Sequence, residues 1–102
     1  MEMKNGWTDT RVFRICKFLE FGKRKSDGQD FVKFLVEWTQ RDGSVGNALC
    51  WAWNYWAEYA GGLAEGELVR ITFEIKKKSY PNKRNGYDNV FELSVDRMEE
   101  VV

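Results

Sequence analysis

Residues 66–75 read Gly-Glu-Leu-Val-Arg-Ile-Thr-Phe-Glu-Ile and contain the most regular alternation of the chain. Apolar side chains occupy every second position from Val69 to Ile75, and polar side chains lie between them. Successive side chains of a β-strand point to opposite faces of the sheet, so this pattern predicts a strand with one buried face. The other elements are assigned outward from this strand.

Another strand is predicted further along the chain. From Phe91 to Val95, apolar residues again occupy every second position, and polar residues separate them. Residues 76–90 lie between the two strands, and their content of lysine, asparagine and glycine is typical of a loop. We therefore expect two strands joined by a long basic loop.

Three more strands are predicted before residue 54, over residues 10–21, 30–40 and 45–53. The first two are separated by residues 22–29, which are glycine, serine, aspartate, glutamine and basic residues. Residues 41–44 separate the next two and contain the Asp-Gly pair that is favoured in β-hairpins. Both connections are therefore expected to be turns between neighbouring strands.

The first of these strands changes its buried face. Phe13 and Ile15 share one parity, whereas Val12, Cys16 and Phe18 share the other. A strand that moves its apolar residues from one face to the other contains a bulge or a sharp coil. We expect this irregularity in the middle of residues 10–21.

A short helix is predicted between the third and fourth strands. Asn54 is suited to cap its first turn, and the glycine pair at 61–62 is suited to end it. Trp56, Ala60 and Leu63 are spaced so that they form one apolar stripe on such a helix. We expect this stripe to cover one end of the sheet.

The predicted order is β-β-β-α-β-β, an all-β chain with one short helix. Five strands, a coiled first strand and a helix at this position describe an OB-fold, a small, partly open Greek-key barrel. We expect residues 10–102 to form this single domain, behind a flexible N-terminal lead-in of residues 1–9. In an OB-fold, the loops that join strands 1–2 and 4–5 flank the binding face.

The second half of the chain resembles a known class of proteins. Residues 63–75, Tyr80 and Tyr87 in the following loop, and Val-Phe-Glu-Leu-Ser-Val at 90–95 are similar to small bacterial OB-fold proteins of the single-stranded-DNA-binding class. They resemble especially an uncharacterised family with an L-x-x-G-[DE]-x-V-x-[IV]-x-F-x-I strand before a Tyr-containing loop. The resemblance covers residues 45–98 and implies an OB-fold that binds single-stranded DNA. Residues 81–86 replace the Gly-Arg turn of that family with a longer insertion.

The positive charge is concentrated in the two flanking loops. The chain has sixteen Lys and Arg residues and sixteen Asp and Glu residues, so it is neutral overall. Eight of the sixteen basic residues lie in residues 23–25 and 76–84. Two basic loops on one side of a barrel are suited to a polymeric anion, of which nucleic acid is the commonest. The alternative is that lysines only keep the hairpin tips soluble and block edge pairing.

Binding of single strands combines basic residues with aromatic rings on which bases stack. We therefore predict non-catalytic binding of single-stranded nucleic acid, DNA in preference to RNA. The residues expected to neutralise phosphates are Lys23, Arg24, Lys25, Lys76, Lys77, Lys78, Lys83 and Arg84, and those expected to stack on bases are Trp51, Trp53, Tyr80 and Tyr87.

Trp51 and Trp53 have the parity opposite to the small residues Ala48, Cys50 and Ala52. If the small row faces the barrel interior, both tryptophans lie on the outer face, where OB-folds stack bases. If the large row faces inward, they belong to the core, and burial in a dimer interface is a third placement. Parity alone leaves all three open, and the outer face is our working prediction.

Trp38 and the two cysteines are expected in the core. Trp38 continues an apolar row that includes Val36, and Cys16 and Cys50 are the only cysteines. The chain has no histidine, so a zinc site would need carboxylates beside the two thiolates, which is unusual. We expect both cysteines to be reduced and buried, with a disulfide as the less favoured alternative.

The sequence carries no sign of an enzyme. It has no phosphate-binding loop and no calcium loop, and the missing histidine removes the usual general base. Its acids form no close cluster on one element, which disfavours a metal-dependent nuclease. We therefore expect no catalytic residue, metal or small-molecule cofactor.

Two further classes of binding protein stay open. A protein–protein module, including a homo-oligomer, would use the outer aromatic face without needing the lysines. An oligosaccharide binder would stack sugars on the same rings. No apolar stretch is long enough to span a membrane, and no apolar region follows the N-terminus, so we expect a cytoplasmic protein with no membrane partner.

Overall fold

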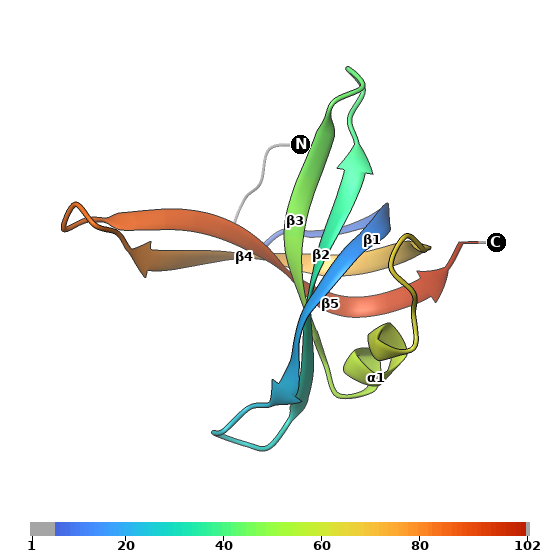
Figure 1. Cartoon of the computed structure of the whole chain (residues 1–102), viewed down its shortest axis with the longest axis horizontal. Helices are drawn as coiled ribbons and strands as arrows, with labels where there is room; N and C mark the ends of the chain where they lie inside the picture. The colour runs from blue at the N-terminus through green and yellow to red at the C-terminus, as the bar shows by residue number, and fades with distance from the viewer. Residues whose placement is uncertain (1–5, 102) are drawn as a thin grey trace.

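The computed structural model describes residues 6–101. The strands and the helix follow each other in the predicted order, β-β-β-α-β-β (Figure 1). Their bounds are Thr8–Lys23 for β1, Asp30–Thr39 for β2, Val45–Trp53 for β3, Tyr55–Gly61 for α1, Leu68–Pro81 for β4 and Tyr87–Glu100 for β5.

The strands form a closed barrel in the order β1-β2-β3-β5-β4. Neighbouring strands are antiparallel, except for β3 and β5, whose parallel pairing closes the barrel. Five strands in this order with a helix between β3 and β4 constitute an OB-fold, which confirms the predicted fold class.

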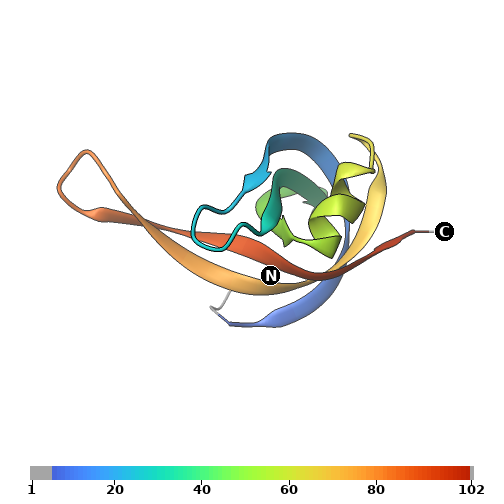
Figure 2. The ribbon, with the colours of Figure 1, turned by 90° about the horizontal axis from the view of Figure 1, so that it is seen from below.

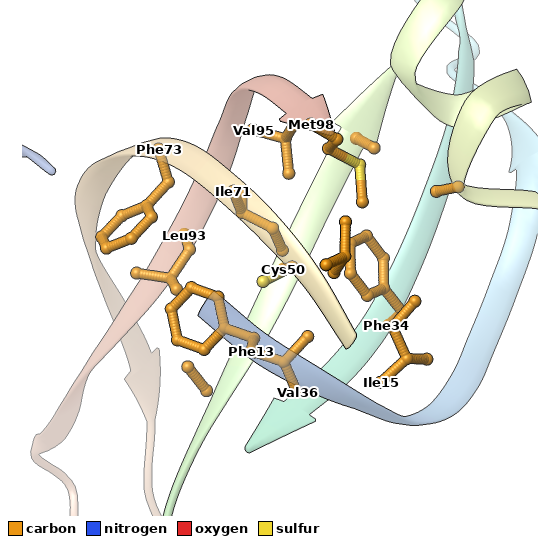
Figure 3. Close-up of a cluster of buried hydrophobic side chains, with 14 of the residues drawn as sticks. Phe13, Ile15, Phe34, Val36, Cys50, Ile71, Phe73, Leu93, Val95 and Met98 are labelled. Atoms are coloured by element: carbon orange, nitrogen blue, oxygen red, sulfur yellow. The ribbon is translucent and has the colours of Figure 1, made fainter. Parts of the chain in front are cut away.

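The alternating rows of apolar side chains fill the barrel. Every second residue of β4 from Val69 to Ile75 is buried, as the alternation predicts. Phe13, Phe34 and Phe73 are the largest of the fully buried side chains. Figure 3 shows that the labelled core residues come from all five strands and point toward one another. Burial of this apolar surface is the main contribution to the stability of the fold.

β1 contains the predicted irregularity. Its pairing with β2 shifts register between Ile15 and Lys17 and again between Phe18 and Glu20. Phe13 and Ile15 are buried before the first shift, and Phe18 packs against the core after it. The bulges let one long strand coil around the barrel while apolar side chains of both parities reach the interior.

β1 begins two residues earlier than predicted. Gly6 and Trp7 extend the pairing with β4, since Gly6 donates to the Ile75 carbonyl and the Ile75 amide donates to the Trp7 carbonyl, each at 2.7 Å. The part of the predicted lead-in before residue 6 lies outside the described residues.

The long loop predicted over residues 76–90 is wrong. β4 continues to Pro81 and β5 starts at Tyr87, so only residues 82–86 form a turn. The two strands project from the barrel as an arm (Figures 1 and 2). The side chains of residues 76–81 are exposed, so the arm lacks the apolar alternation that would reveal a strand in the sequence.

The helix α1 lies where it was predicted, but its start differs in detail. Asn54 makes no side-chain capping bond, and its backbone has a φ of 51°. Its carbonyl accepts the Glu58 amide at 3.1 Å instead. Ala57 and Ala60 are buried against the barrel, and Trp56 and Leu63 of the predicted stripe pack around them.

Trp38 packs against the core as predicted, with its ring 5.8 Å from that of Phe13 in an edge-on arrangement. Cys50 is fully buried, whereas Cys16 is only half-buried, so the prediction of burial is wrong for Cys16. Cys16 follows Ile15 at the first bulge, where the strand changes its buried face. Both cysteines are free thiols.

Among the helices of the described residues, none has the length and apolar character that crossing a membrane requires.

Candidate functional site

The two tryptophans of β3 lie on the outer face of the barrel. Ala48, Cys50 and Ala52 are buried, and Trp51 and Trp53, which alternate with them, are half-buried. The small row faces the interior because three small side chains leave room there for the phenylalanines of β1, β2 and β4. The outer placement of both tryptophans is therefore confirmed.

The rings of Trp51 and Trp53 are nearly parallel. Their centroids are 6.0 Å apart, and their planes differ by 10°. Phe31 lies opposite Trp53 in the neighbouring strand β2, and its ring centroid is 5.6 Å from that of each tryptophan. The three side chains make one continuous aromatic surface.

Two cations lie over this surface. The Arg24 guanidinium is 4.8 Å from the ring centroid of Trp53, and the Lys33 ammonium is 5.1 Å from that of Trp51. Lys33 pairs directly with Trp51 across β2 and β3, and Arg24 comes from the connection between β1 and β2. These distances are within the range of cation–π attraction.

The aromatic surface is one wall of a groove with a volume of about 510 Å³. The β4–β5 arm contributes the opposite side, with Lys76 and Lys78. We call this feature the aromatic groove. Its lining residues are Arg24, Phe31, Trp51, Trp53, Lys76, Lys78, Glu92, Leu93 and Ser94.

A buried acid connects the two sides of the groove. Glu92 of β5 is 1% exposed. The Trp51 indole N–H donates to its Oε1 at 2.6 Å, and the Tyr80 hydroxyl donates to its Oε2 at 2.9 Å. The hydrogen bond to this carboxylate, followed by burial, raises the pKa of Tyr80. One carboxylate therefore holds an aromatic side chain from β3 and another from β4.

The pleat of the arm divides the predicted site residues between two faces. Lys76 lies opposite Glu92, and Lys78 and Tyr80 follow on the same side of β4. Lys77 and Tyr87 lie on the other side, in line with the buried Ile75 and Leu93. The structure thus brings Lys76, Lys78 and Tyr80 to the aromatic groove but not Lys77 or Tyr87.

The remaining predicted basic residues lie at the two turns. Lys23 ends β1 and pairs with Asp30 at 2.7 Å, and Lys25 follows in the connection to β2. Lys83 and Arg84 lie in the turn at the tip of the arm, outside the groove lining. The Asn82 side chain shapes that turn by accepting the backbone amides of Arg84 and Gly86 at 2.9 and 3.0 Å.

Several of these cations already have acidic partners. Arg24 forms an ion pair with Asp27, and Lys76 forms one with Glu74. Among the described residues, Lys78 forms no ion pair. The three groove cations therefore differ, because an anion must compete with a carboxylate at Arg24 and Lys76 but meets an uncompensated charge at Lys78.

Sequence reasoning missed Phe31, Lys33 and Glu92. The first two are paired with Trp53 and Trp51 by the β2–β3 register, but a two-residue Asp-Gly turn would have shifted that register by one residue, so the sequence does not give these pairs. The alternation of residues 91–95 puts Glu92 on the polar face of its strand, and no local pattern indicates that the arm and β3 bury that position.

Neither a protein-family model nor a curated protein sequence matches this chain. Solved structures do match it. The SSB domain of a Synechococcus sp. protein has a TM-score of 0.72 and 10% sequence identity, over 98% of this chain and 100% of that chain. The protein PriB from Ralstonia solanacearum has a TM-score of 0.71 and 9% identity, over 92% and 97%.

A mitochondrial single-stranded DNA binding protein from S. cerevisiae, Rim1, also matches, with a TM-score of 0.72 and 16% identity over 94% of this chain and 95% of that chain. At identities this low the matches concern the backbone and not the side chains of the aromatic groove. They show that this chain shares its fold with these proteins over nearly its whole length.

Proposed function

We propose that this protein binds single-stranded nucleic acid, DNA in preference to RNA, in the aromatic groove and without catalysis. The observation that carries the proposal is the pair of near-parallel tryptophans with cations above them, in a groove between the two basic hairpins. The resemblance of the fold to a mitochondrial single-stranded DNA binding protein supports it.

Stacking explains why the ligand should be single-stranded. A base offers its flat face to an aromatic ring only when it is free of its neighbours in a duplex, and each stacked base contributes roughly 1–3 kcal/mol. Stacking and phosphate pairing do not read the edges of bases, so the binding should depend little on sequence. The stacking residues are Trp51 and Trp53, with Tyr80 on the same face of the arm; Tyr87, on the other face, would meet only bases of a strand that continues past the groove.

The phosphates would meet the rim of the groove. Arg24, Lys76 and Lys78 line the groove. The nucleic-acid strand would continue from there toward the two turns, which carry Lys23, Lys25, Lys83 and Arg84. Lys77 lies on the far side of the arm. The protein is neutral overall, so acids elsewhere repel strands that miss the rim. We expect modest affinity for a single copy of the domain.

The test is tryptophan fluorescence during titration with a short oligo-dT at low salt and again at about 0.3 M salt. If about five phosphates are neutralised, the logarithm of the affinity falls with the logarithm of salt concentration at a slope of roughly −3.5. Quenching should disappear when Trp51 and Trp53 are both changed to Phe, but persist in a Trp56→Phe control on α1. No quenching at low salt, or a flat salt response, would refute the proposal.

A protein partner on the same face is the competing function. Exposed apolar residues beyond the groove, including Phe21 and Tyr55 at 59% and 67% exposure, favour it. Changing Lys76, Lys77 and Lys78 together to Glu should abolish nucleic-acid binding and leave such an interface intact. An oligosaccharide would bind this variant as strongly as it binds the wild-type protein, and its affinity would be the same at low salt and at about 0.3 M salt.

A further inference from the structure

Glu92 is an unexpected residue for the floor of an anion-binding groove. Every other charged side chain lining the groove, within residues 6–101, is basic: Arg24, Lys76 and Lys78. Glu92 is also the single charged side chain among the buried residues described. The groove therefore has a positive rim and a negative floor.

Stability alone does not explain a carboxylate at this position. Removing a carboxylate from water is unfavourable, and hydrogen bonds compensate for that loss only in part. An apolar side chain of similar size would fill the same space without this loss. The two hydrogen bonds that Glu92 accepts instead hold the two rings that would stack on bases, those of Trp51 and Tyr80.

We propose that Glu92 is a positioning residue that makes the groove accept nucleobases on its floor and directs phosphates to its rim. The inference rests on the proposed function. Its hydrogen bonds fix the planes of Trp51 and Tyr80 before a base arrives, which reduces the ordering that binding requires. Its charge repels a phosphate that enters the floor, where the surrounding protein weakens solvent screening.

The test compares two strands of equal length and charge, oligo-dT and an oligomer of abasic deoxyribose phosphate. We expect wild-type protein to prefer oligo-dT. Glu92→Gln keeps the size of the side chain and an oxygen that accepts from Trp51, but removes the charge. It should bind the abasic strand about fivefold more tightly than wild type does, the effect expected for one lost like-charge interaction in a partly solvated site. The preference for oligo-dT should fall accordingly.

Asp96→Asn is the matched control, because it removes one negative charge from an exposed position of the same strand. A gain through net charge alone would appear in both variants and for both strands. A purely structural role of Glu92 would change the affinity for both strands by the same factor. Either result, or an unchanged preference in Glu92→Gln, would overturn the inference.

Tyr80→Phe tests the inference if Glu92→Gln does not fold. It keeps the ring and removes only the hydroxyl that binds Glu92, so oligo-dT should bind about threefold more weakly while the abasic strand binds as before. Equal affinities of wild type and Tyr80→Phe for oligo-dT would overturn the inference. If wild-type protein binds neither strand at low salt, the proposed function itself fails. If wild-type protein prefers oligo-dT and Glu92→Gln keeps the same preference, only the inference about Glu92 fails.

Discussion

Gly46 of β3 lies opposite Trp38 of β2, and the indole ring covers its α-carbon. A Cβ atom at position 46 would lie 2.4 Å from Cζ2 of Trp38, too close for any side chain. Gly46→Ala should therefore force the ring out of its contact with the core and destabilise the protein by about 1–3 kcal/mol. The midpoint of urea unfolding measures this change.

Gly62→Ala is the control for that experiment, because a Cβ atom there would meet its nearest described neighbour at an ordinary 3.5 Å. We expect a shift of less than about 0.5 kcal/mol for this variant. Gly46 is also absent from the lining of the aromatic groove, so oligo-dT affinity should survive the substitution. An unfolding midpoint equal to that of wild type would contradict the role assigned to Gly46.

The Arg24 guanidinium holds the pKa of Asp27 below its ordinary value of 3.8, chiefly through a side-chain hydrogen bond. Because the native pKa is lower than the unfolded one, the stabilisation is present above the unfolded value and is lost as pH falls through the native pKa. NMR titration of the carboxyl carbons should give Asp27 a midpoint below 3.8 in wild type and a higher midpoint in Arg24→Gln, where only the backbone hydrogen bonds still lower it.

Asp42 provides an internal reference in the same titration. Hydrogen bonds from the Ser44 hydroxyl and backbone lower its pKa, and Arg24 is not among the causes. Its midpoint should therefore stay low in both proteins. If Asp27 titrates identically with and without Arg24, the guanidinium is not held by that carboxylate in solution.

The β4–β5 arm separates neighbouring lysines by its pleat, which gives a matched pair of charge reversals. Lys78→Glu places an acid beside the groove and should weaken oligo-dT binding by about tenfold. Lys77→Glu makes the same change of charge on the opposite face and should weaken binding by less than about threefold, through long-range repulsion only. Affinity measured by fluorescence titration at low salt separates the two.

Equal losses in both variants would mean that the arm acts through its total charge and not through one face. In that case the groove would not be the binding surface, and the tryptophan substitutions would also have little effect.

The strands of the barrel could be predicted from the sequence because each has one buried and one exposed face. Even the bulge of β1 leaves a signal, in the change of parity between Ile15 and Phe18. The outer half of the arm leaves none, since its pairing rests on backbone hydrogen bonds that any side chains permit. The sequence therefore predicts a loop at residues 76–78, although these three lysines belong to β4.

The candidate site was predictable only in part for a related reason. The contrast between small and large rows in β3 groups Trp51 with Trp53 but does not say which row faces outward. Phe31 and Lys33 depend on the length of the β2–β3 turn, which the Asp-Gly pair does not fix. The burial of Glu92 depends on its contacts with Tyr80 of β4 and Trp51 of β3, which are 12 and 41 residues away from it along the chain. Such contacts are set by the tertiary fold, and no local pattern encodes them.

Closure of the barrel isolates Cys50 from solvent, and this predicts how the whole protein reacts with a thiol reagent. Burial raises the pKa of the Cys50 thiol, and desolvation also raises that of the half-buried Cys16. The thiolate is the reactive form, so Cys50 should react only when the protein opens, about a thousandfold or more slowly than Cys16. Both should react at once in denaturant.

The Cys16→Ser variant should lose the fast reaction, which belongs to Cys16, and keep the slow reaction of Cys50 at an unchanged rate. If the two thiols of the native protein react at one rate, the barrel is open on the time scale of the reaction.

The β3–β5 pairing that closes the barrel extends over only three residue pairs, Leu49 with Glu92, Cys50 with Leu93 and Trp51 with Ser94. The other pairings of the barrel are longer, so backbone amides at this seam should be the first of the barrel to exchange their hydrogens for deuterium. The aromatic groove lies over the same seam. An occupant that contacts Trp51 on one side and Lys78 on the other would hold both margins together, and amide exchange would slow along the whole seam, including Leu49 and Cys50, which do not line the groove.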